Sequence, residues 1–352
     1  MLQIRPLFVS IALTLAASAV QAAALPNGVI YSANEGDGSI SEITLSTGVV
    51  RTVNVSVVPH NIQISPDNKV LLAVGMAATS TNTHDAHGGA EQNDAKAGSH
   101  ADSPASLLLL NASQPGQAMG VLPSGNHPAH VVTSQNGDRA YITNSEANQI
   151  SVVDIEQKKI IAEIPTGSFP HGLRLSPNGQ ELYIANVTDN SVSVIDTQSL
   201  KESARIPVGK APVQVAFTPD GAQLYVSLRD ENSVAIIDTT TRQVVKRIEV
   251  GRNPIQLYTT ADGSKVYVAN QGSDNDPDNT VSVINTSNQS VQDTVITGMG
   301  AHGVVASNDG GFVFITNNKD DTVSAIDAST QAVVATYRVG SNPNGITYRS
   351  IP

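Results

Sequence analysis

A pattern of apolar and polar positions repeats along the middle of the chain. Short apolar runs are separated by turns of the type Ser/Thr-x-Asp/Asn-Gly, of which Ser176-Pro-Asn-Gly179 is an example. After each turn an apolar run begins near a tyrosine, and four of these anchors are 42 residues apart: Tyr141, Tyr183, Tyr225 and Tyr267. Runs rich in Val, Ile and Tyr between turn residues predict strands rather than helices. A period in the forties built from short strands is typical of propeller blades.

The same template extends outward in both directions. Three further anchors are Tyr31, a degenerate Leu72 and Phe314, which makes seven blades. In the clearest blade we predict strand A at Gly172 to Ser176, strand B at Glu181 to Asn186, strand C at Ser191 to Asp196, and strand D ending near Pro207. The sequence therefore predicts an all-β, seven-bladed β-propeller with four-stranded blades.

The two ends of the repeat region are complementary. The first predicted strand, Val29 to Ala33, is a B strand, and the last, Asn344 to Arg349, is a lone A strand. Pairing them would complete the N-terminal blade and close the ring, which removes the exposed edges of an open array. We therefore expect residues 23–352 to form one propeller domain.

The N-terminus has the pattern of an export signal. Arg5 is followed by an apolar stretch, Leu7 to Ala17, and small residues lead to an expected cleavage after Ala22. We interpret residues 1–22 as a signal peptide and expect a periplasmic, monomeric protein without a membrane span. The chain has no cysteine, so it has no disulfide framework. Its net charge of −11 argues against nucleic acid as a partner.

The repeated motifs resemble a known family. The Tyr-Ile/Val-x-Asn strands, the Ser/Thr-Pro-Asp/Asn-Gly turns and strands such as Val192-Ser-Val-Ile-Asp196 are similar to the YVTN-type (YncE-like) repeat family of bacterial β-propellers. The similarity covers nearly all of the chain after residue 22 and implies the propeller fold. It leaves function open, because that family includes binding, surface and cofactor-linked proteins.

The histidines gather at particular connections of the predicted blades. Three of the eight lie in an insertion, Ala78 to Ser106, that follows a B strand and that we expect to be a flexible loop. The other five fall where a D strand leads to an A strand. In a four-stranded meander the D-to-A and B-to-C connections emerge on the same face, so all eight are predicted on one face: His60, His84, His87, His100, His127, His130, His171 and His302.

Three of these histidines share one register. His60, His171 and His302 each stand at the start of an innermost strand, at the mouth of the central channel, in blades two, four and seven. His130 lies one residue later in blade three. Three or four converging imidazoles suit Zn²⁺ or Cu²⁺. The alternative is structural, with each ring capping a strand or bonding a neighbouring carbonyl group.

Other chemical signals are weaker. The run Asp274 to Asp278 resembles calcium ligands but lacks the alternation and final Glu of an EF-hand, so we interpret it as a solvated turn. Motifs of Cys or Gly-x-Ser-x-Gly nucleophiles, phosphate loops and haem attachment are absent from the sequence. Seven-bladed lactonases carry acidic residues and histidines in the channel, whereas here the aligned register has no acid.

These patterns favour metal binding without catalysis. We predict that His84, His87 and His100 capture zinc or copper and that the histidines at the channel mouth hold it. This combination resembles the periplasmic β-propeller zinc chaperones, which implies a protein partner docking on the histidine face. One alternative is a protein–protein interaction scaffold in which the histidines are incidental, and another is a metal-dependent, lactonase-like hydrolase.

Overall fold

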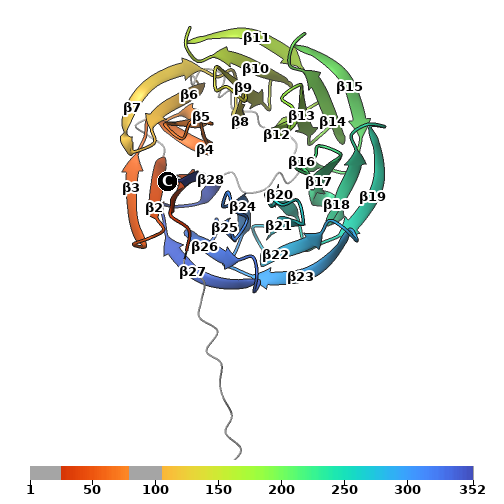
Figure 1. Ribbon diagram of the computed structural model, residues 1–352. Coiled ribbons are helices and arrows are strands. Elements are labelled where there is room, and N and C mark those ends of the chain that lie inside the picture. Colours follow the sequence, from red (N-terminus) through yellow and green to blue (C-terminus); the bar gives the residue numbers. More distant parts are fainter. Residues whose placement is uncertain (1–24, 79–104, 352) are drawn as a thin grey trace, which may run out of the picture.

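Seven antiparallel sheets of four strands each surround a central channel in the computed structural model (Figure 1). The structure describes residues 25–78 and 105–351. Within these ranges the one helical element is the short 3₁₀ helix η1 (Arg229–Glu231). The predicted all-β, seven-bladed propeller is therefore confirmed.

The inner half of each blade consists of its A and B strands. The A strands line the channel, in the order of blades two to seven and then one: β4 (Val57–Ile64), β8 (Pro128–Thr133), β12 (Pro170–Leu175), β16 (Pro212–Phe217), β20 (Pro254–Thr259), β24 (Ala301–Ala306) and β28 (Pro343–Ser350). The B strands of blades one to seven are β1 (Gly28–Asn34), β5 (Val70–Ala77), β9 (Arg139–Asn144), β13 (Glu181–Asn186), β17 (Gln223–Leu228), β21 (Lys265–Gly272) and β25 (Phe312–Asn317).

The outer half consists of the C and D strands. The C strands of blades one to seven are β2 (Ser39–Thr44), β6 (Ala105–Asn111), β10 (Gln149–Asp154), β14 (Ser191–Asp196), β18 (Ser233–Asp238), β22 (Pro277–Asn285) and β26 (Thr322–Asp327). The D strands at the rim are β3 (Val49–Asn54), β7 (Gln114–Pro123), β11 (Lys159–Pro165), β15 (Lys201–Pro207), β19 (Gln243–Glu249), β23 (Ser290–Ile296) and β27 (Ala332–Arg338).

The turns between A and B strands explain why the repeat is easily recognised in the sequence. In blade five the Thr218 hydroxyl donates to Oδ1 of Asp220 at 2.6 Å, and Oδ1 in turn accepts from the backbone N–H of Ala222 at 3.0 Å. Gly221 has a φ of +71°, which a residue with a side chain rarely adopts. The turn chemistry is therefore local, and the strands that flank each turn begin and end at predictable positions.

The ring closes where the two ends of the chain meet. Strand β28 pairs antiparallel with β1, with Tyr348 opposite Ile30, and completes the sheet β28-β1-β2-β3. The C-terminal A strand thus belongs to the N-terminal blade, as predicted. Each blade has two neighbours, so no blade has an unpaired inner face.

The hydrophobic core is a ring of layers between neighbouring blades. Each of seven clusters joins residues of two adjacent blades. Tyr183 of blade four, for example, is fully buried and belongs to the same cluster as Val215 and Leu224 of blade five. Full burial of one such side chain contributes roughly 1.5–3 kcal/mol. The anchors that mark the repeat in the sequence are therefore the residues that attach one blade to the next.

Blade two departs from the repeat for a steric reason. Its anchor ends in Gly75, where most other blades have Asn, and a Cβ at this position would lie 1.8 Å from the carbonyl oxygen of Val58. Glycine is required because the backbone of β4 approaches β5 so closely. The predicted signal peptide (1–22) and His84, His87 and His100 of the predicted loop lie outside the described residues. In the part that is described, no helix is long and apolar enough to span a membrane.

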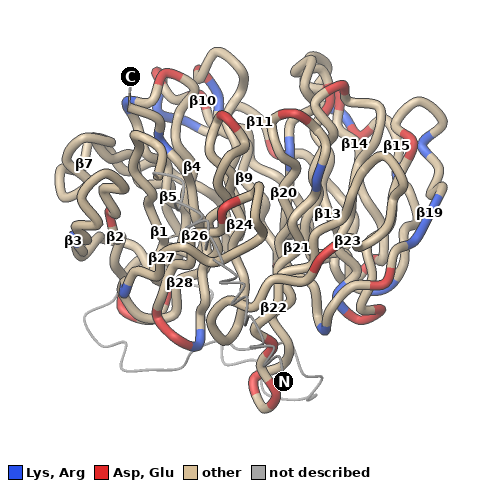
Figure 2. Tube along the Cα trace, turned by 60° about the horizontal axis from the view of Figure 1, so that its bottom comes forward, with Lys and Arg blue, Asp and Glu red and all other residues tan. Residues whose placement is uncertain are grey.

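Charged residues lie mainly in the loops and along the outer strands, as the tube view shows (Figure 2). The carboxylates of the acidic run between β21 and the start of β22 each have a cationic partner. Nζ of Lys319 lies 2.6 Å from Oδ1 of Asp274, and Arg252 pairs with both Asp276 and Asp278. Because these carboxylates already have cationic partners, the arrangement supports a charged surface turn rather than a calcium site.

Candidate metal centre

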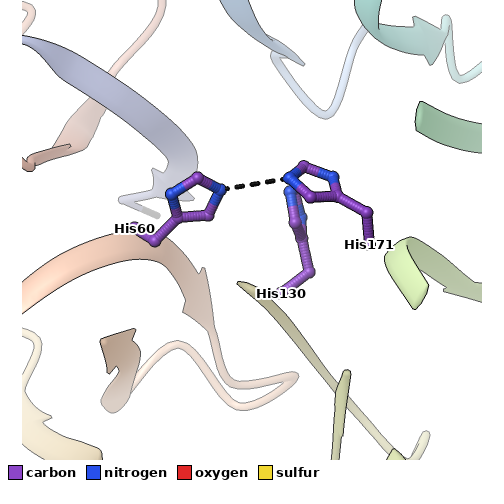
Figure 3. A group of neighbouring side chains, drawn as sticks. All are labelled: His60, His130 and His171. Atoms are coloured by element: carbon purple, nitrogen blue, oxygen red, sulfur yellow. Dashed lines mark hydrogen bonds between the residues drawn. The ribbon is translucent and has the colours of Figure 1, made fainter. Parts of the chain in front are cut away.

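Three imidazoles come together at one end of the channel. His60 lies on β4, His130 on β8 and His171 on β12, the innermost strands of the adjacent blades two, three and four. One possible ligand atom from each lies within 4.8 Å of the others. The ring centroids are 4.7 to 5.8 Å apart, and Figure 3 shows the three rings pointing toward one another. We call these three residues the histidine triad.

Within the triad, Nε2 of His60 lies 3.3 Å from Nε2 of His171. Two nitrogens on a tetrahedral zinc ion, each about 2.0–2.1 Å from the metal, lie about 3.3–3.4 Å apart. The observed separation therefore matches one edge of a tetrahedral site. The ligand atom of His130 lies within 4.8 Å of the other two, so its ring must approach by at most about 1.5 Å to complete the same geometry.

A β-bulge in each A strand aims these side chains. In β12 the regular pairing with β13 stops at Pro170–Asn186 and resumes at Leu173–Ile184, so His171 and Gly172 lie in the bulge. His60 and His130 lie in the corresponding bulges of β4 and β8. A bulge bends the strand and turns side chains out of the regular alternation. This is how His130, one residue out of register with the others, still reaches the same point.

The hydroxyl of Thr143 connects two of the bulges. Its Oγ1 accepts from the backbone N–H of His130 at 3.0 Å and donates to the backbone carbonyl of His171 at 2.7 Å. Thr143 is the third residue of the blade-three anchor, Tyr-Ile-Thr-Asn. One side chain of the repeat motif thus holds the main chains of two triad members in a fixed relation.

The turn that leads into β12 is also held from the neighbouring blade. Oδ1 of Asn148, in the β9–β10 connection, accepts from the backbone N–H of Phe169 at 2.8 Å. Phe169 has a φ of +57° and precedes Pro170, whose ring fixes the first residue of the strand. His171 therefore follows a turn whose geometry is constrained on both sides.

A carboxylate orients His60. Nδ1 of His60 lies 3.1 Å from Oε1 of Glu35, which follows β1 in the B-to-C connection of blade one. Glu35 also accepts a hydrogen bond from the side-chain amide of Asn344 on β28. With the proton on Nδ1, Nε2 of His60 presents its lone pair toward His171. A carboxylate behind a histidine in this way is the usual second partner of a metal ligand.

Burial and mutual repulsion keep most of these rings neutral. Burial and the neighbouring His171 and His60 hold the pKa of His130 well below its ordinary value. The pKa of His171 is likewise well below normal, through burial and the charge of His60. Partial burial also disfavours the charged form of His60, but the Glu35 carboxylate outweighs it and the pKa of His60 is raised. Neutral imidazole is the form that binds metal.

Two triad nitrogens are buried without a hydrogen bond of normal geometry. One is Nε2 of His130, a residue that is only 1% exposed. The other is Nδ1 of His171, where the nearby backbone carbonyl of Val213 favours the protonated form of the ring. A buried polar atom without a partner costs free energy, roughly 1–3 kcal/mol. The unsatisfied nitrogen of His130 therefore adds to the case that this cluster receives a ligand.

Two other histidines of the described residues, His302 and His127, lie outside the triad. His302 is on β24, with 6% exposure and an unpartnered Nδ1, and burial followed by the charge of His60 lowers its pKa to about 4. It feels the charge of His60 but lies outside the triad. His127 is partly exposed, with Nδ1 3.4 Å from Glu146. The structure thus places His130, rather than His302, beside His60 and His171. The three imidazoles come from the adjacent blades two, three and four, whereas the register predicted histidines from the well-separated blades two, four and seven.

Sequence reasoning missed Glu35. No acidic residue occupies the aligned register of the innermost strands, but Glu35 reaches the site from a loop of another blade. The signal that could have found it is positional: Glu35 directly follows the last residue of the first anchor, Asn34, and so emerges on the histidine face.

The fold and the site together define a seven-bladed β-propeller with a histidine triad at the mouth of its channel. Two family models match this chain: "Cytochrome D1 heme domain" over residues 44–262 and "YNCE-like beta-propeller" over residues 221–350. The chain therefore belongs to the family of the cytochrome D1 haem domain, whose model covers more than half of it. The second match confirms the predicted resemblance to YncE-like propellers. No curated protein sequence matches the chain.

Solved structures share the fold over most of the chain. Hydrazine synthase of Kuenenia stuttgartiensis is 22% identical, with a TM-score of 0.67 and coverage of 82% of this chain and 88% of that chain. A protein of Bacteroides fragilis provisionally assigned as a 6-phosphogluconolactonase is 12% identical, with a TM-score of 0.71 and coverage of 92% and 98%. The dihydro-heme d1 dehydrogenase NirN is 11% identical, with a TM-score of 0.61 and coverage of 94% and 77%. At these identities the likeness concerns the fold alone.

Proposed function

We propose that this propeller binds one transition-metal ion, zinc or copper, through His60, His130 and His171 without catalysing a reaction. The observation that carries the proposal is the 3.3 Å separation of the two Nε2 atoms of His60 and His171, with a third, unsatisfied imidazole nitrogen beside them. Neutral imidazoles suit both ions. Glu35 supports the proposal because it holds His60 in the ligating tautomer.

The family name raises haem as another ligand, and the triad does not fit one between its rings. Two histidines that both ligate a haem iron do so from opposite faces, with the macrocycle between them. Here the nitrogens of His60 and His171 are 3.3 Å apart and the ring centroids 5.3 Å. Such closely packed rings leave no space for a tetrapyrrole plane, whereas a single ion needs none.

The competing structural interpretation is a hydrogen bond between the two rings. Glu35 accepts from the Nδ1–H of His60, so Nε2 of His60 is free to accept a hydrogen bond from the Nε2–H of His171. In that case the triad would stabilise the apo protein and removal of His171 would lower stability whether or not metal is added. Under the metal-site proposal, the loss of stability on removing His171 is larger when metal is present.

The test is the metal content of the protein purified without an affinity tag, together with zinc and copper affinity after chelation and dialysis. We expect about one ion per chain in the wild type and none at the triad in His171→Ala or His130→Ala. An ion at one hundred times its Kd stabilises the folded state by about 2.7 kcal/mol. That thermal shift should vanish in both variants. Visible absorption from bound haem, or a wild type that binds no metal, would overturn the proposal.

Two matched variants separate the triad from other histidines on the same face. His127→Ala removes the partly exposed histidine beside Glu146 and should leave affinity unchanged. His302→Ala tests the register expectation and should weaken binding less than His130→Ala does. Replacement of His84, His87 and His100 by serine, residues that lie outside the described part, reports any metal bound by the predicted loop. We expect the triad ion to remain in that variant.

A metal-dependent hydrolase is the second candidate. Three protein ligands leave the fourth position of a zinc ion open, which is the arrangement of catalytic zinc sites. A panel of lactones assayed with zinc-loaded protein tests this candidate. We expect no turnover, and a lactonase activity that disappears in His171→Ala would replace the non-catalytic assignment.

The cellular role follows from the export signal expected at residues 1–22. We propose that the protein holds its ion in the periplasm and hands it to a protein that docks on the histidine face. Support comes from the triad's position at the mouth of the channel, where a partner can reach it. Fractionation of the source cells tests the location, and transfer of radioactive zinc to a candidate acceptor tests delivery.

A further inference from the structure

A cation crosses the interior of the channel below the triad. Arg174 is on β12, four residues after Pro170, and its Cζ lies 6.0 Å from the centre of the Tyr258 ring. Tyr258 is at the same position in β20, two blades away. Between them stands β16, whose equivalent residue is the small Ala216. The side chain of Arg174 therefore passes in front of blade five, inside the lumen.

This cation has no acidic partner among the residues that the structure describes. Its one hydrogen bond runs from Nη1 to the carbonyl of Leu173, at 3.0 Å on its own strand. The remaining donors of the guanidinium are left for another group, since arginine carries five N–H bonds. Burial lowers the pKa of Arg174, and the neighbouring Tyr258 opposes this shift. A cation in a confined space is costly without a counter-charge.

The sequence underlines how unusual this residue is. Arg174 and Arg349 are the only Lys, Arg, Asp or Glu residues in the seven A strands. Arg349 is directed away from the lumen, where it donates to the carbonyl of Ala112 and the hydroxyl of Ser113. The chain as a whole has a net charge of −11, so general attraction for anions does not account for a lone cation inside the channel.

We propose that the channel binds a small oxyanion, a carboxylate or a phosphate, on the guanidinium of Arg174. The planar fork of arginine matches two oxygens of either group. Arg174 is partly exposed, so its free donors are accessible to a small ligand in the channel, and walls of low dielectric constant concentrate the field of a cation. Arg174 is on the same innermost strand as His171, three residues further along, so the guanidinium and the triad belong to the same part of the channel wall. A metal ion there would add a second positive charge for the same anion.

The test is calorimetric titration of inorganic phosphate and, separately, of acetate at low ionic strength, with both metal-free and zinc-loaded protein. We expect binding to the metal-free wild type, tighter binding to the zinc-loaded form, and a loss of at least tenfold in Arg174→Gln. Arg174→Lys, which keeps the charge but not the fork, should lie between them. Arg349→Gln is the matched control and should bind like the wild type. Whichever anion binds more tightly identifies the chemistry of the ligand.

The outcomes separate this proposal from the metal site. Arg174-dependent anion binding by a protein that takes up no metal would support the anion site and overturn the metal site. Stoichiometric zinc with anion affinities that Arg174→Gln and Arg174→Lys leave unchanged would overturn the anion site alone. Absence of binding for both anions in both forms of the protein would also overturn it. Circular dichroism of each variant establishes that it is folded.

Discussion

Glu35 and His60 stand on different blades, yet Oε1 of one lies 3.1 Å from Nδ1 of the other. Glu35 also accepts a hydrogen bond from Asn344, on the strand that closes the ring. The orientation of one triad member is therefore set by the blade in which the two ends of the chain meet. Metal affinity and ring closure should be coupled through this carboxylate.

Replacing Glu35 should weaken metal binding without removing a ligand. We expect Glu35→Ala to lower affinity by about 10- to 100-fold, since His60 loses the group that fixes its tautomer. Glu35→Gln, which can still accept a hydrogen bond, should have a smaller effect. Competition with a chromophoric chelator measures both. Glu146→Ala is the control, because Glu146 faces His127 on the same face; equal losses in Glu35→Ala and Glu146→Ala would contradict the assignment.

Thr143 should matter for the triad through the main chain. Thr143→Ala leaves the backbone N–H of His130 and the carbonyl of His171 without their partner. We expect a loss of about 1–3 kcal/mol in unfolding free energy, together with weaker metal binding. Ser227 makes the equivalent bonds to Gln214 and Ile255, in blades without a triad residue. Ser227→Ala should cost similar stability in urea titrations while metal affinity is kept; parallel losses of affinity would count against a positioning role.

Removing the closing strand should destabilise the whole ring. Deletion of residues 343–352 removes β28, including the buried side chains of Ile346 and Tyr348, and exposes an edge of β1. Each of these side chains contributes roughly 1.5–3 kcal/mol, so we expect a loss of more than about 3 kcal/mol and a single shifted transition. A chain ending after Ser350 is the control. An unchanged urea midpoint in the longer deletion would show that closure is dispensable.

Acid should destabilise the turns between the A and B strands. The hydroxyl of Thr218 is the main cause that holds the pKa of Asp220 below its ordinary value of 3.8, and Asp262 and Asp309 have the same arrangement with Thr260 and Ser307. A depressed carboxyl pKa contributes stability that is complete above pH 3.8 and is lost as the pH falls through the lowered value.

The matched variant carries asparagine at all three positions. Asn178 already fills this role in blade four, where it accepts from Ser176 at 2.7 Å. The triple Asp→Asn protein should therefore be close to wild type at pH 7 and should lose less stability between pH 4 and pH 2. Urea midpoints across that range decide the matter, and identical pH profiles for the two proteins would show that other groups control acid sensitivity.

Much of the fold could be predicted because its determinants are local. Strands β13 and β14 begin and end at the predicted residues, Glu181–Asn186 and Ser191–Asp196. Turn residues and β-rich runs lie next to one another in the chain, and the period of 42 repeats them. Strand β12 begins at Pro170, two residues before the predicted start, because pairing at Pro170–Asn186 precedes the bulge.

The site was less accessible to sequence reasoning because it depends on the bulges. Aligning the innermost strands by their first residues grouped His302 with His60 and His171. In that alignment His130 is one residue later than the others. The bulge in each innermost strand breaks that alignment, and His130 reaches the others from the adjacent blade. Glu35 and Arg174 act across blades, from a loop and across the lumen, and no local pattern links them to the residues they face.

The bulge itself recurs in all seven innermost strands, with Val213 and Gln214, Ile255 and Gln256, and Asn344 and Gly345 where other blades have histidine. The ring of blades thus has seven equivalent bulge positions at the channel. The side chains at these positions determine the chemistry of the channel. The interblade core does not depend on that choice. In a propeller of this kind, the residues at one bulge can be substituted independently of the others. The same scaffold can therefore acquire, move or lose a binding site while its fold stays the same.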